Sequence, residues 1–264
     1  MRVVLLLLLS SLAFLASCTG ENPWYEPGGG VDLAETAVPA EMVRVPGGTF
    51  PMGSADGQPD EQPVRAVAVS DFLLDRTLVT VGAYRRCVAA GICSAPAKGV
   101  PCNWTEAAGS RESHPINCVS WFQAADFCAL NRKRMPTEEE FEYAARGPSG
   151  SVYAWGNAAP IVPGRGQPQL CWNQPLSTCP VGSFAPTLLG KPDRDGAFDL
   201  GGNLWEWMAG RYCFYGTTRC TENLALRGGA WNRTDPADMR AARRNATVAA
   251  AQASDVGFRC ARNP

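Results

Sequence analysis

Histidine is almost absent from this sequence, since His114 is the only one among 264 residues. A metal centre built on three histidines is therefore excluded. Because His114 precedes Pro115, we expect it to be a surface or turn residue. The net charge is −1 at neutral pH, which gives no electrostatic basis for binding nucleic acid. The apolar run Val3–Leu15 is too short to span a bilayer comfortably.

The first 41 residues predict export and lipid anchoring. Arg2 precedes the apolar run, and the run ends in Ala16, Ser17 and Cys18, which resembles a bacterial lipobox. We expect a signal peptide over residues 1–17, lipidation of Cys18, and a flexible Gly- and Pro-rich tether over residues 18–41. Thr19 in place of aspartate is similar to Gram-negative lipoproteins of the outer membrane. The alternative is an ordinary secretory signal.

The cysteine count supports export. Eleven cysteines are present, and removing Cys18 leaves an even ten, which is typical of a disulfide framework in an exported protein. Proximity favours two bridges, Cys171–Cys179 and Cys213–Cys220. Three pairings remain open for the cysteines that precede the middle of the chain, namely Cys87, Cys93, Cys102 and Cys118.

Residues 42–264 are expected to form one domain. Val64–Leu74 alternates apolar and polar residues, which predicts a half-buried strand. Three helices are expected to begin after Thr80, Ser120 and Thr137, and the last two starts have the capping-box pattern. In the second helix, Phe122, Ala125, Cys128 and Ala129 share a face, and in the third helix Phe141, Ala144 and Ala145 do so. Long irregular stretches are expected at residues 91–118, 147–196 and 208–226, so the fold class is α+β with little regular secondary structure.

The segment Asp199–Trp207 (DLGGNLWEW) carries the strongest chemical signal. Two adjacent glycines allow a close backbone approach, and the acids Asp199 and Glu206 flank them. Carboxylate and carbonyl oxygens are the ligands that Ca²⁺ prefers. The alternative is a tight loop whose tryptophans only fill the core.

Four ordered motifs resemble the formylglycine-generating enzyme family, also called the sulfatase-modifying factor family. They are MVRVPGGTFPMG at 42–53, RMPTEEEFEYAARG at 134–147, GNLWEW at 202–207, and RGGAW at 227–231 with GFRC at 257–260. The resemblance implies a fold like that of C-type lectins. It also implies a bridge between Cys128 and Cys260.

The same resemblance raises the question of catalysis. Family enzymes oxidise a substrate cysteine with O₂ at Cu(I), which is bound by two cysteines shortly after the Arg-Gly-Gly strand. Here residues 232–240 contain no cysteine, and Arg233 and Asp238 stand at the two positions. Neither suits Cu(I), so we expect no copper and no catalytic cysteine pair. A related sulfoxide-forming branch uses iron bound by three histidines, which this chain lacks.

Calcium is the cofactor that the resemblance favours. By position, Asp199 and Glu206 would supply carboxylates, Gly202 and Leu204 would supply carbonyls, and Asn203 would brace the turn. Asn173 is a weak candidate for the family's other calcium site. Glu138, Glu139 and Glu140 can be interpreted as catalytic carboxylates or as helix capping, and capping is the simpler interpretation.

Arginines gather near the expected active face. They form either a self-paired, solvated patch or a groove for an anionic or peptide ligand. The residues are Arg227, Arg233, Arg240, Arg243 and Arg244, with Asp235 and Asp238.

Three functions follow for this chain. The preferred one is an envelope-anchored family member that lacks oxidase chemistry and binds an unknown protein or an anionic ligand. The second is an enzyme with another metal or cysteine arrangement, for example one that converts a cysteine of an exported sulfatase-type substrate to formylglycine. The third is a structural envelope component without a ligand.

Overall fold

The computed structural model describes residues 41–161, 170–184 and 196–264. The expected signal peptide, Cys18 and nearly all of the tether lie outside these residues. Within them, no helix is both long and apolar enough to cross a membrane.

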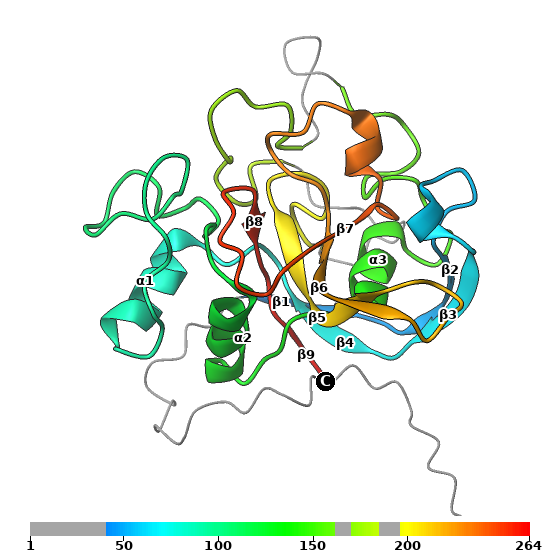
Figure 1. Cartoon of the computed structure of the whole chain (residues 1–264), viewed down its shortest axis with the longest axis horizontal. Coiled ribbons are helices and arrows are strands. Elements are labelled where there is room, and N and C mark those ends of the chain that lie inside the picture. Colours follow the sequence, from blue (N-terminus) through cyan, green and yellow to red (C-terminus); the bar gives the residue numbers. More distant parts are fainter. Residues whose placement is uncertain (1–40, 162–169, 185–195) are drawn as a thin grey trace, which may run out of the picture.

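Three sheets make up the β part of the molecule (Figure 1). A three-stranded sheet has the order β1 (Met42–Val45), β4 (Phe72–Asp75), β9 (Ala261–Arg262). A hairpin joins β2 (Gly48–Met52) to β3 (Arg65–Val69). The largest sheet has the order β7 (Arg244–Thr247), β6 (Cys220–Arg227), β5 (Trp205–Cys213), β8 (Val256–Gly257). Its β5–β8 pair is parallel and the other pairs are antiparallel.

The three helices begin at the predicted N-caps. They are α1 (Val81–Ala89), α2 (Trp121–Leu130) and α3 (Glu138–Arg146). Both predicted capping boxes are present, at the starts of α2 and α3. Because a capping box satisfies backbone N–H groups that the first turn leaves unpaired, it fixes where each helix starts.

Two predictions about strands are wrong. Val64–Leu74 is two strands in different sheets, β3 and β4, because the chain turns between Val69 and Phe72. Residues 208–226 are mostly strand, since β5 and β6 form a hairpin through them. The β5–β6 register shifts on both sides of Arg211, and this irregularity removes the strict alternation that would have indicated strands.

The predicted inner face of α2 is also wrong in part. Phe122 is exposed, whereas Trp121, Ala124, Phe127 and Cys128 are buried. The predicted face of α3 is confirmed, since Phe141, Ala144 and Ala145 are at most 1% exposed.

The β5–β6 hairpin separates two halves of the core. Trp205, Trp207, Leu224 and Leu226 pack toward α1 and α2. Met208 and Ala225 pack toward α3 and the N-terminal strands. In Figure 1, α2 lies on one side of this hairpin and α3 with β2 and β3 lies on the other. The largest sheet therefore stands at the centre of the molecule.

Five disulfides close the domain. Cys128–Cys260, Cys171–Cys179 and Cys213–Cys220 form as predicted. The open pairings resolve to Cys87–Cys93 and Cys102–Cys118. All ten cysteines of the domain are thus oxidised.

The described parts of residues 147–196 contain no helix or strand of the fold, which agrees with the predicted irregular stretch.

Candidate functional site

The segment Asp199–Trp207 passes through the middle of the molecule, tied to two other segments. The Gly202 N–H donates to the Gly228 carbonyl at 2.7 Å, and the Asn203 N–H donates to the Cys171 carbonyl at 2.7 Å. A Cβ at residue 202 would lie 2.5 Å from the Cys171 carbonyl oxygen, and φ there is 80°. Glycine is therefore required for this close approach.

Asn203 braces the loop against a disulfide. Its Nδ2 donates to the Cys179 carbonyl at 3.2 Å, and its Oδ1 accepts from the Cys179 N–H at 3.3 Å. Its own φ is 61°, a conformation that asparagine tolerates better than most residues. The side chain thus fixes the loop to the Cys171–Cys179 bridge.

Glu206 is fully buried and paired with Arg259. The guanidinium donates to both carboxylate oxygens, at 2.7 and 2.8 Å, and neither residue is exposed. Arg259 also donates to the carbonyls of Phe198 and Asp199, at 2.9 and 3.2 Å. Burial raises the pKa of Glu206, and the positive charge of Arg259 offsets part of that rise. A cation in this oxygen-lined region is therefore already supplied by the protein.

Asp199, in contrast, forms no ion pair with any lysine or arginine in the part of the chain that the structure describes. Its Oδ2 accepts from the Gly182 N–H at 2.9 Å. Burial raises the pKa of Asp199, while Gly182 and the charge of Arg259 act in the opposite direction. A buried carboxylate that is disfavoured in this way is what a bound cation would stabilise.

The oxygen set therefore fits Ca²⁺ in part. Asp199 and Glu206 supply carboxylates, and the carbonyls of Gly202 and Leu204 lie in the same loop. A carboxylate oxygen can accept more than one contact, so the Arg259 pair does not by itself exclude a second partner for Glu206. Among the described residues, no three or more His, Cys, Asp or Glu side chains cluster as metal ligands, so such a site relies on carbonyls. Asn173 has φ 49° and donates its N–H to the Arg233 carbonyl at 3.0 Å.

The two positions expected to bind copper hold ion-paired side chains instead. Arg233 Nη2 lies 2.8 Å from Asp255 Oδ2, and Arg243 Nε lies 3.2 Å from Asp238 Oδ1. Arg233 and Asp238 thus each form an ion pair with another residue, not with each other. No cysteine of residues 42–264 is free as a thiol to replace them, because all ten form disulfides.

The predicted five-arginine groove is not present as an open surface. Arg227 and Arg244 are buried at 0% and 1% exposure. Arg244 donates to both oxygens of Glu138, at 2.8 and 2.6 Å, and Arg227 pairs with Glu142. Both guanidinium groups are thus buried together with carboxylates of α3, and the prediction did not anticipate these partners.

Arg240 is likewise paired with a buried carboxylate, since it donates to both oxygens of Glu61 at 2.7 and 2.5 Å. Only Arg233 and Arg243 keep part of their side chains exposed without such a buried partner. A signal for the buried network was available in the sequence. Glu138 and Glu142 are four residues apart on α3 and flank Phe141, so acids stand on the apolar face.

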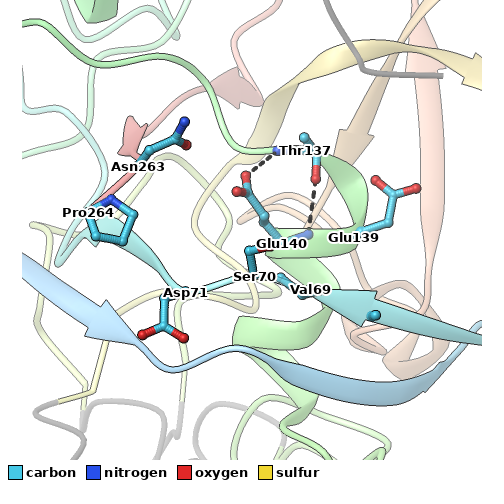
Figure 2. A pocket seen from close by; sticks show the side chains of 9 residues that line it. Val69, Ser70, Asp71, Thr137, Glu139, Glu140, Asn263 and Pro264 are labelled. Atoms are coloured by element: carbon cyan, nitrogen blue, oxygen red, sulfur yellow. Dashed lines mark hydrogen bonds between the residues drawn. The ribbon is translucent and has the colours of Figure 1, made fainter. Parts of the chain in front are cut away.

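Glu140 has the capping role that the sequence favoured. Its Oε2 accepts from the Thr137 N–H at 2.9 Å, and Arg134 donates to both of its oxygens. An open hollow of about 540 Å³ lies beside this helix start, lined by Thr137, Glu140 and Asp71 among others (Figure 2). Its three side-chain carboxylates, those of Asp71, Glu139 and Glu140, are each paired with an arginine.

His114 is part of a polar cluster. Its Nδ1 lies 2.9 Å from Thr178 Oγ1, and Asn103 Nδ2 donates to the same hydroxyl at 2.9 Å. Burial lowers the pKa of His114, and Arg111 adds to this effect. The neutral imidazole thus connects the loop before α2 to the segment that contains Cys179.

Comparison with known proteins places these observations in a family. Residues 31–264 match the family described as "Sulfatase-modifying factor enzyme 1-like domain". The inactive C-alpha-formylglycine-generating enzyme 2 of Bos taurus is 30% identical, and the match covers 90% of this chain and 91% of that protein. The formylglycine-generating enzyme of Streptomyces coelicolor is 29% identical, with coverages of 83% and 88%. The structure of PvdO from Pseudomonas aeruginosa is similar with a TM-score of 0.65 and 25% identity, over 91% of this chain and all of that one.

Proposed function

Because the chain belongs to the sulfatase-modifying factor family, whose members include formylglycine-generating enzymes, we propose that it is a member without copper-dependent cysteine oxidation. In its place we infer a binding role at the cell envelope. Family membership alone does not decide between these activities, since the matched relatives include both enzymes and a protein named as inactive.

One observation carries the proposal: every cysteine of the domain is in a disulfide. Cu(I) needs soft ligands, and thiolates are the ones that proteins supply best. A cystine sulfur has no charge to donate to the metal. The residues standing at the two expected positions are a guanidinium and a carboxylate, each held by an ion pair. These ion pairs and disulfides support a domain without ligands suited to Cu(I).

We propose Ca²⁺ as the resident cofactor, held by Asp199, the carbonyls of Gly202 and Leu204, and Glu206. The ion would supply charge to the buried carboxylate of Asp199 and cross-link the loop, with no part in a reaction. Asn173 remains a weaker candidate for a second ion. Arg259 already compensates Glu206, so we expect Asp199 to be the residue on which calcium affinity depends most.

The envelope location rests on the N-terminal sequence. We propose that lipid on Cys18 anchors the mature protein in the outer membrane of a Gram-negative cell and that the domain binds an exported protein or an anionic ligand. The partly exposed Arg233 and Arg243 are the arginines of the candidate groove that such a ligand could reach. Substituting Cys18→Ser should move the protein from the membrane fraction to the soluble envelope fraction.

The decisive experiment is an oxidation assay. The oxidised domain is loaded with Cu(I) and incubated aerobically with a Cys-x-Pro-x-Arg peptide, and formylglycine is measured by mass spectrometry. The Streptomyces coelicolor enzyme serves as the positive control. We expect no product, and titration of the folded domain should find no free thiol. Copper-dependent product, or two reduced cysteines, would overturn the proposal.

A further inference from the structure

The Cys213–Cys220 disulfide differs from the other four in its exposure. Cys220 is exposed and Cys213 is half-buried, whereas every other bridge has at least one cysteine that is 7% exposed or less. A thiolate can attack a disulfide only if it can approach one of the sulfurs in line with the S–S bond. Cys213–Cys220 is therefore the bridge of the described structure that offers the best access.

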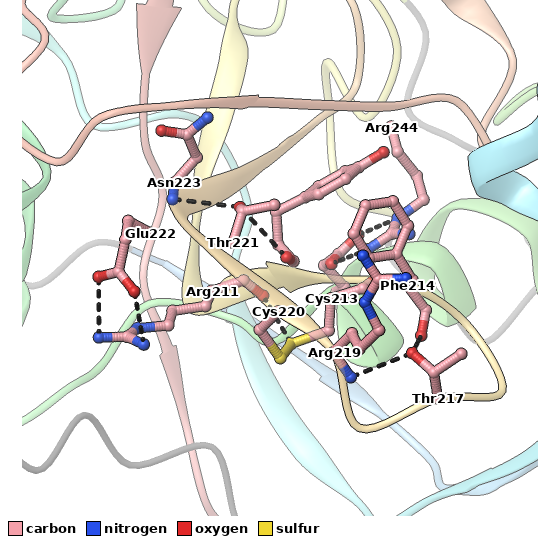
Figure 3. Close-up of a disulfide and its surroundings, with 12 residues drawn as sticks. Arg211, Cys213, Phe214, Thr217, Arg219, Cys220, Thr221, Glu222, Asn223 and Arg244 are labelled. Atoms are coloured by element: carbon pink, nitrogen blue, oxygen red, sulfur yellow. Dashed lines mark hydrogen bonds and ion pairs between the residues drawn. A yellow bond between two sulfur atoms is a disulfide. The ribbon is translucent and has the colours of Figure 1, made fainter.

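The bridge also lies where opening it leaves the core intact. Cys213 and Cys220 are directly opposite each other at the outer end of the β5–β6 hairpin, next to the turn (Figure 3). The inner end of the hairpin is held separately, through the Glu206–Arg227 and Trp207–Leu226 pairs and the buried core around them. Breaking the bond removes one link at the end of the hairpin, where neither Cys213 nor Cys220 belongs to a buried core cluster.

Two arginines lie near the bridge, of which Arg244 is paired with Glu138. Arg219 precedes Cys220 and is exposed, its guanidinium lies 5.6 Å from the centre of the Phe214 ring, and no carboxylate of the described residues forms an ion pair with it. Arg244 Nη2 donates to the Cys213 carbonyl at 2.9 Å. A cation beside the attacked sulfur, here Arg219, attracts an anionic thiolate.

From this arrangement we propose that Cys213–Cys220 is a thiol–disulfide exchange site, with Cys220 as the sulfur attacked by small-molecule or protein thiols. An incoming thiolate forms a disulfide with Sγ of Cys220 as the Cys213–Cys220 bond breaks. The electron pair leaves on Sγ of Cys213, which takes a proton from water. Attack by the Cys213 thiolate on the mixed disulfide then restores the bridge and releases the thiol. One disulfide replaces another, so no oxidant is required.

The first test uses the oxidised domain and reduced glutathione. The protein is incubated with glutathione at mildly alkaline pH, free thiols are alkylated at intervals, and each cysteine is quantified by peptide mass spectrometry. We expect Cys213 and Cys220 to open at least about tenfold faster than any other pair, with glutathione mainly on Cys220. Near-UV circular dichroism should keep its native signal after this opening. Equal opening of all bridges, or faster opening of another, would contradict the proposal.

A pair of single variants tests which sulfur is attacked. In Cys213→Ser, Cys220 is a free thiol. Once oxidised glutathione has formed a mixed disulfide with Cys220, no Cys213 thiolate is present to displace the glutathione, so the mixed disulfide should accumulate. Cys220→Ser leaves only the half-buried Cys213 and is the matched control, which should react several-fold more slowly. Equal rates in the two variants would refute the assignment to Cys220.

Charge is tested by Arg219→Gln with Arg211→Gln as control, since Arg211 is already paired with Glu222. We expect Arg219→Gln to slow the exchange with glutathione about threefold at low salt, and the difference to shrink as salt is added. No effect, or an equal effect of both variants, would remove the electrostatic part of the argument.

Discussion

At the scale of single residues, Glu142 is a buried carboxylate that pairs with two arginines. It is fully buried, accepts from the Gly53 N–H at 2.7 Å, and pairs with both Arg146 and Arg227. Removing its charge would leave the buried guanidinium of Arg227 with Glu138, 3.5 Å away, as its remaining carboxylate. The sequence offered the acids of α3 but not their partners, because Arg227 lies 85 residues further along the chain.

We expect Glu142→Gln to lower the free energy of unfolding by about 3–5 kcal/mol, because the buried guanidinium of Arg227 keeps only the more distant Glu138 as a carboxylate partner. Glu139→Gln on the same helix is the control. Its pair with Arg65 is more than a third exposed on both sides, so its loss should cost under about 1 kcal/mol. Urea unfolding of the two variants measures the difference. Similar losses would show that the buried network does not hold the domain together.

Asp199 is the residue at which the calcium proposal can be tested. With Ca²⁺ at a hundred times its dissociation constant, the domain should gain about 2.7 kcal/mol in unfolding free energy. Asp199→Asn can keep the Gly182 contact and the backbone conformation but loses the charge. We expect it to abolish the calcium-dependent gain while costing little stability in chelator. If the variant still gains unfolding free energy with Ca²⁺, the ion binds at another site.

At the scale of secondary-structure elements, α1 is joined to the loop that follows it by one ion pair. Arg85 of α1 donates to Glu112 at 2.7 Å and stacks over the Trp104 ring at 4.5 Å. The hydrogen bond from Arg85 lowers the pKa of Glu112. A carboxyl whose pKa is lowered by folding contributes stability above its unfolded pKa, and loses it as the pH falls through the folded value.

We therefore expect Glu112→Gln to be less stable than the unmodified protein by up to about 1 kcal/mol at pH 7. The two should become equally stable once the pH lies below the lowered pKa of Glu112. Unfolding curves at several pH values between 7 and 2.5 measure this convergence. A difference that stays constant with pH would mean that packing, and not charge, explains the loss.

Elements were predictable from sequence where the signal was local. Thr80, Ser120 and Thr137 cap their own helices within three residues, so the three helix starts were predicted correctly. The β5–β6 hairpin was missed because its bulge breaks the alternation. The exposure of Phe122 was missed because the face of α2 is selected by Trp121, whose ring nitrogen donates to the Met208 carbonyl of β5 at 2.9 Å. That contact depends on tertiary structure.

For the whole molecule, the Cys128–Cys260 bridge is the largest covalent constraint, with 132 residues between its ends. In the chain-entropy account, closing such a loop contributes about 5 kcal/mol, against about 2 kcal/mol for the short Cys213–Cys220 loop. We expect the double substitution of Cys128 and Cys260 by serine to destabilise the domain about twice as much as that of Cys213 and Cys220. Denaturant unfolding compares them. A larger loss of stability on removing Cys213–Cys220 than on removing Cys128–Cys260 would contradict the inference that the Cys213–Cys220 bridge can open without unfolding the domain.

The fold as a whole could be predicted from four motifs, whereas the expected absence of a copper site stays a prediction. The arginine groove could not. Whether Arg227 and Arg244 face solvent depends on how α3, with Glu138 and Glu142, packs against the β5–β6 hairpin. No local sequence pattern predicts that packing. The pairing of Arg259 with Glu206 was hidden for the same reason, since 53 residues separate them.

The order of the cysteines has a consequence for biogenesis. Cys128 pairs with the last cysteine, Cys260, whereas the other four bridges join neighbours in the sequence. If the chain is exported as proposed, Cys171 becomes available to Cys128 in an oxidising compartment long before Cys260 does. Strand β9 likewise reaches β4 only after the rest of the domain has been made. Maturation of this protein should therefore depend on a disulfide isomerase, and a cell without one should accumulate scrambled forms with Cys128 wrongly joined.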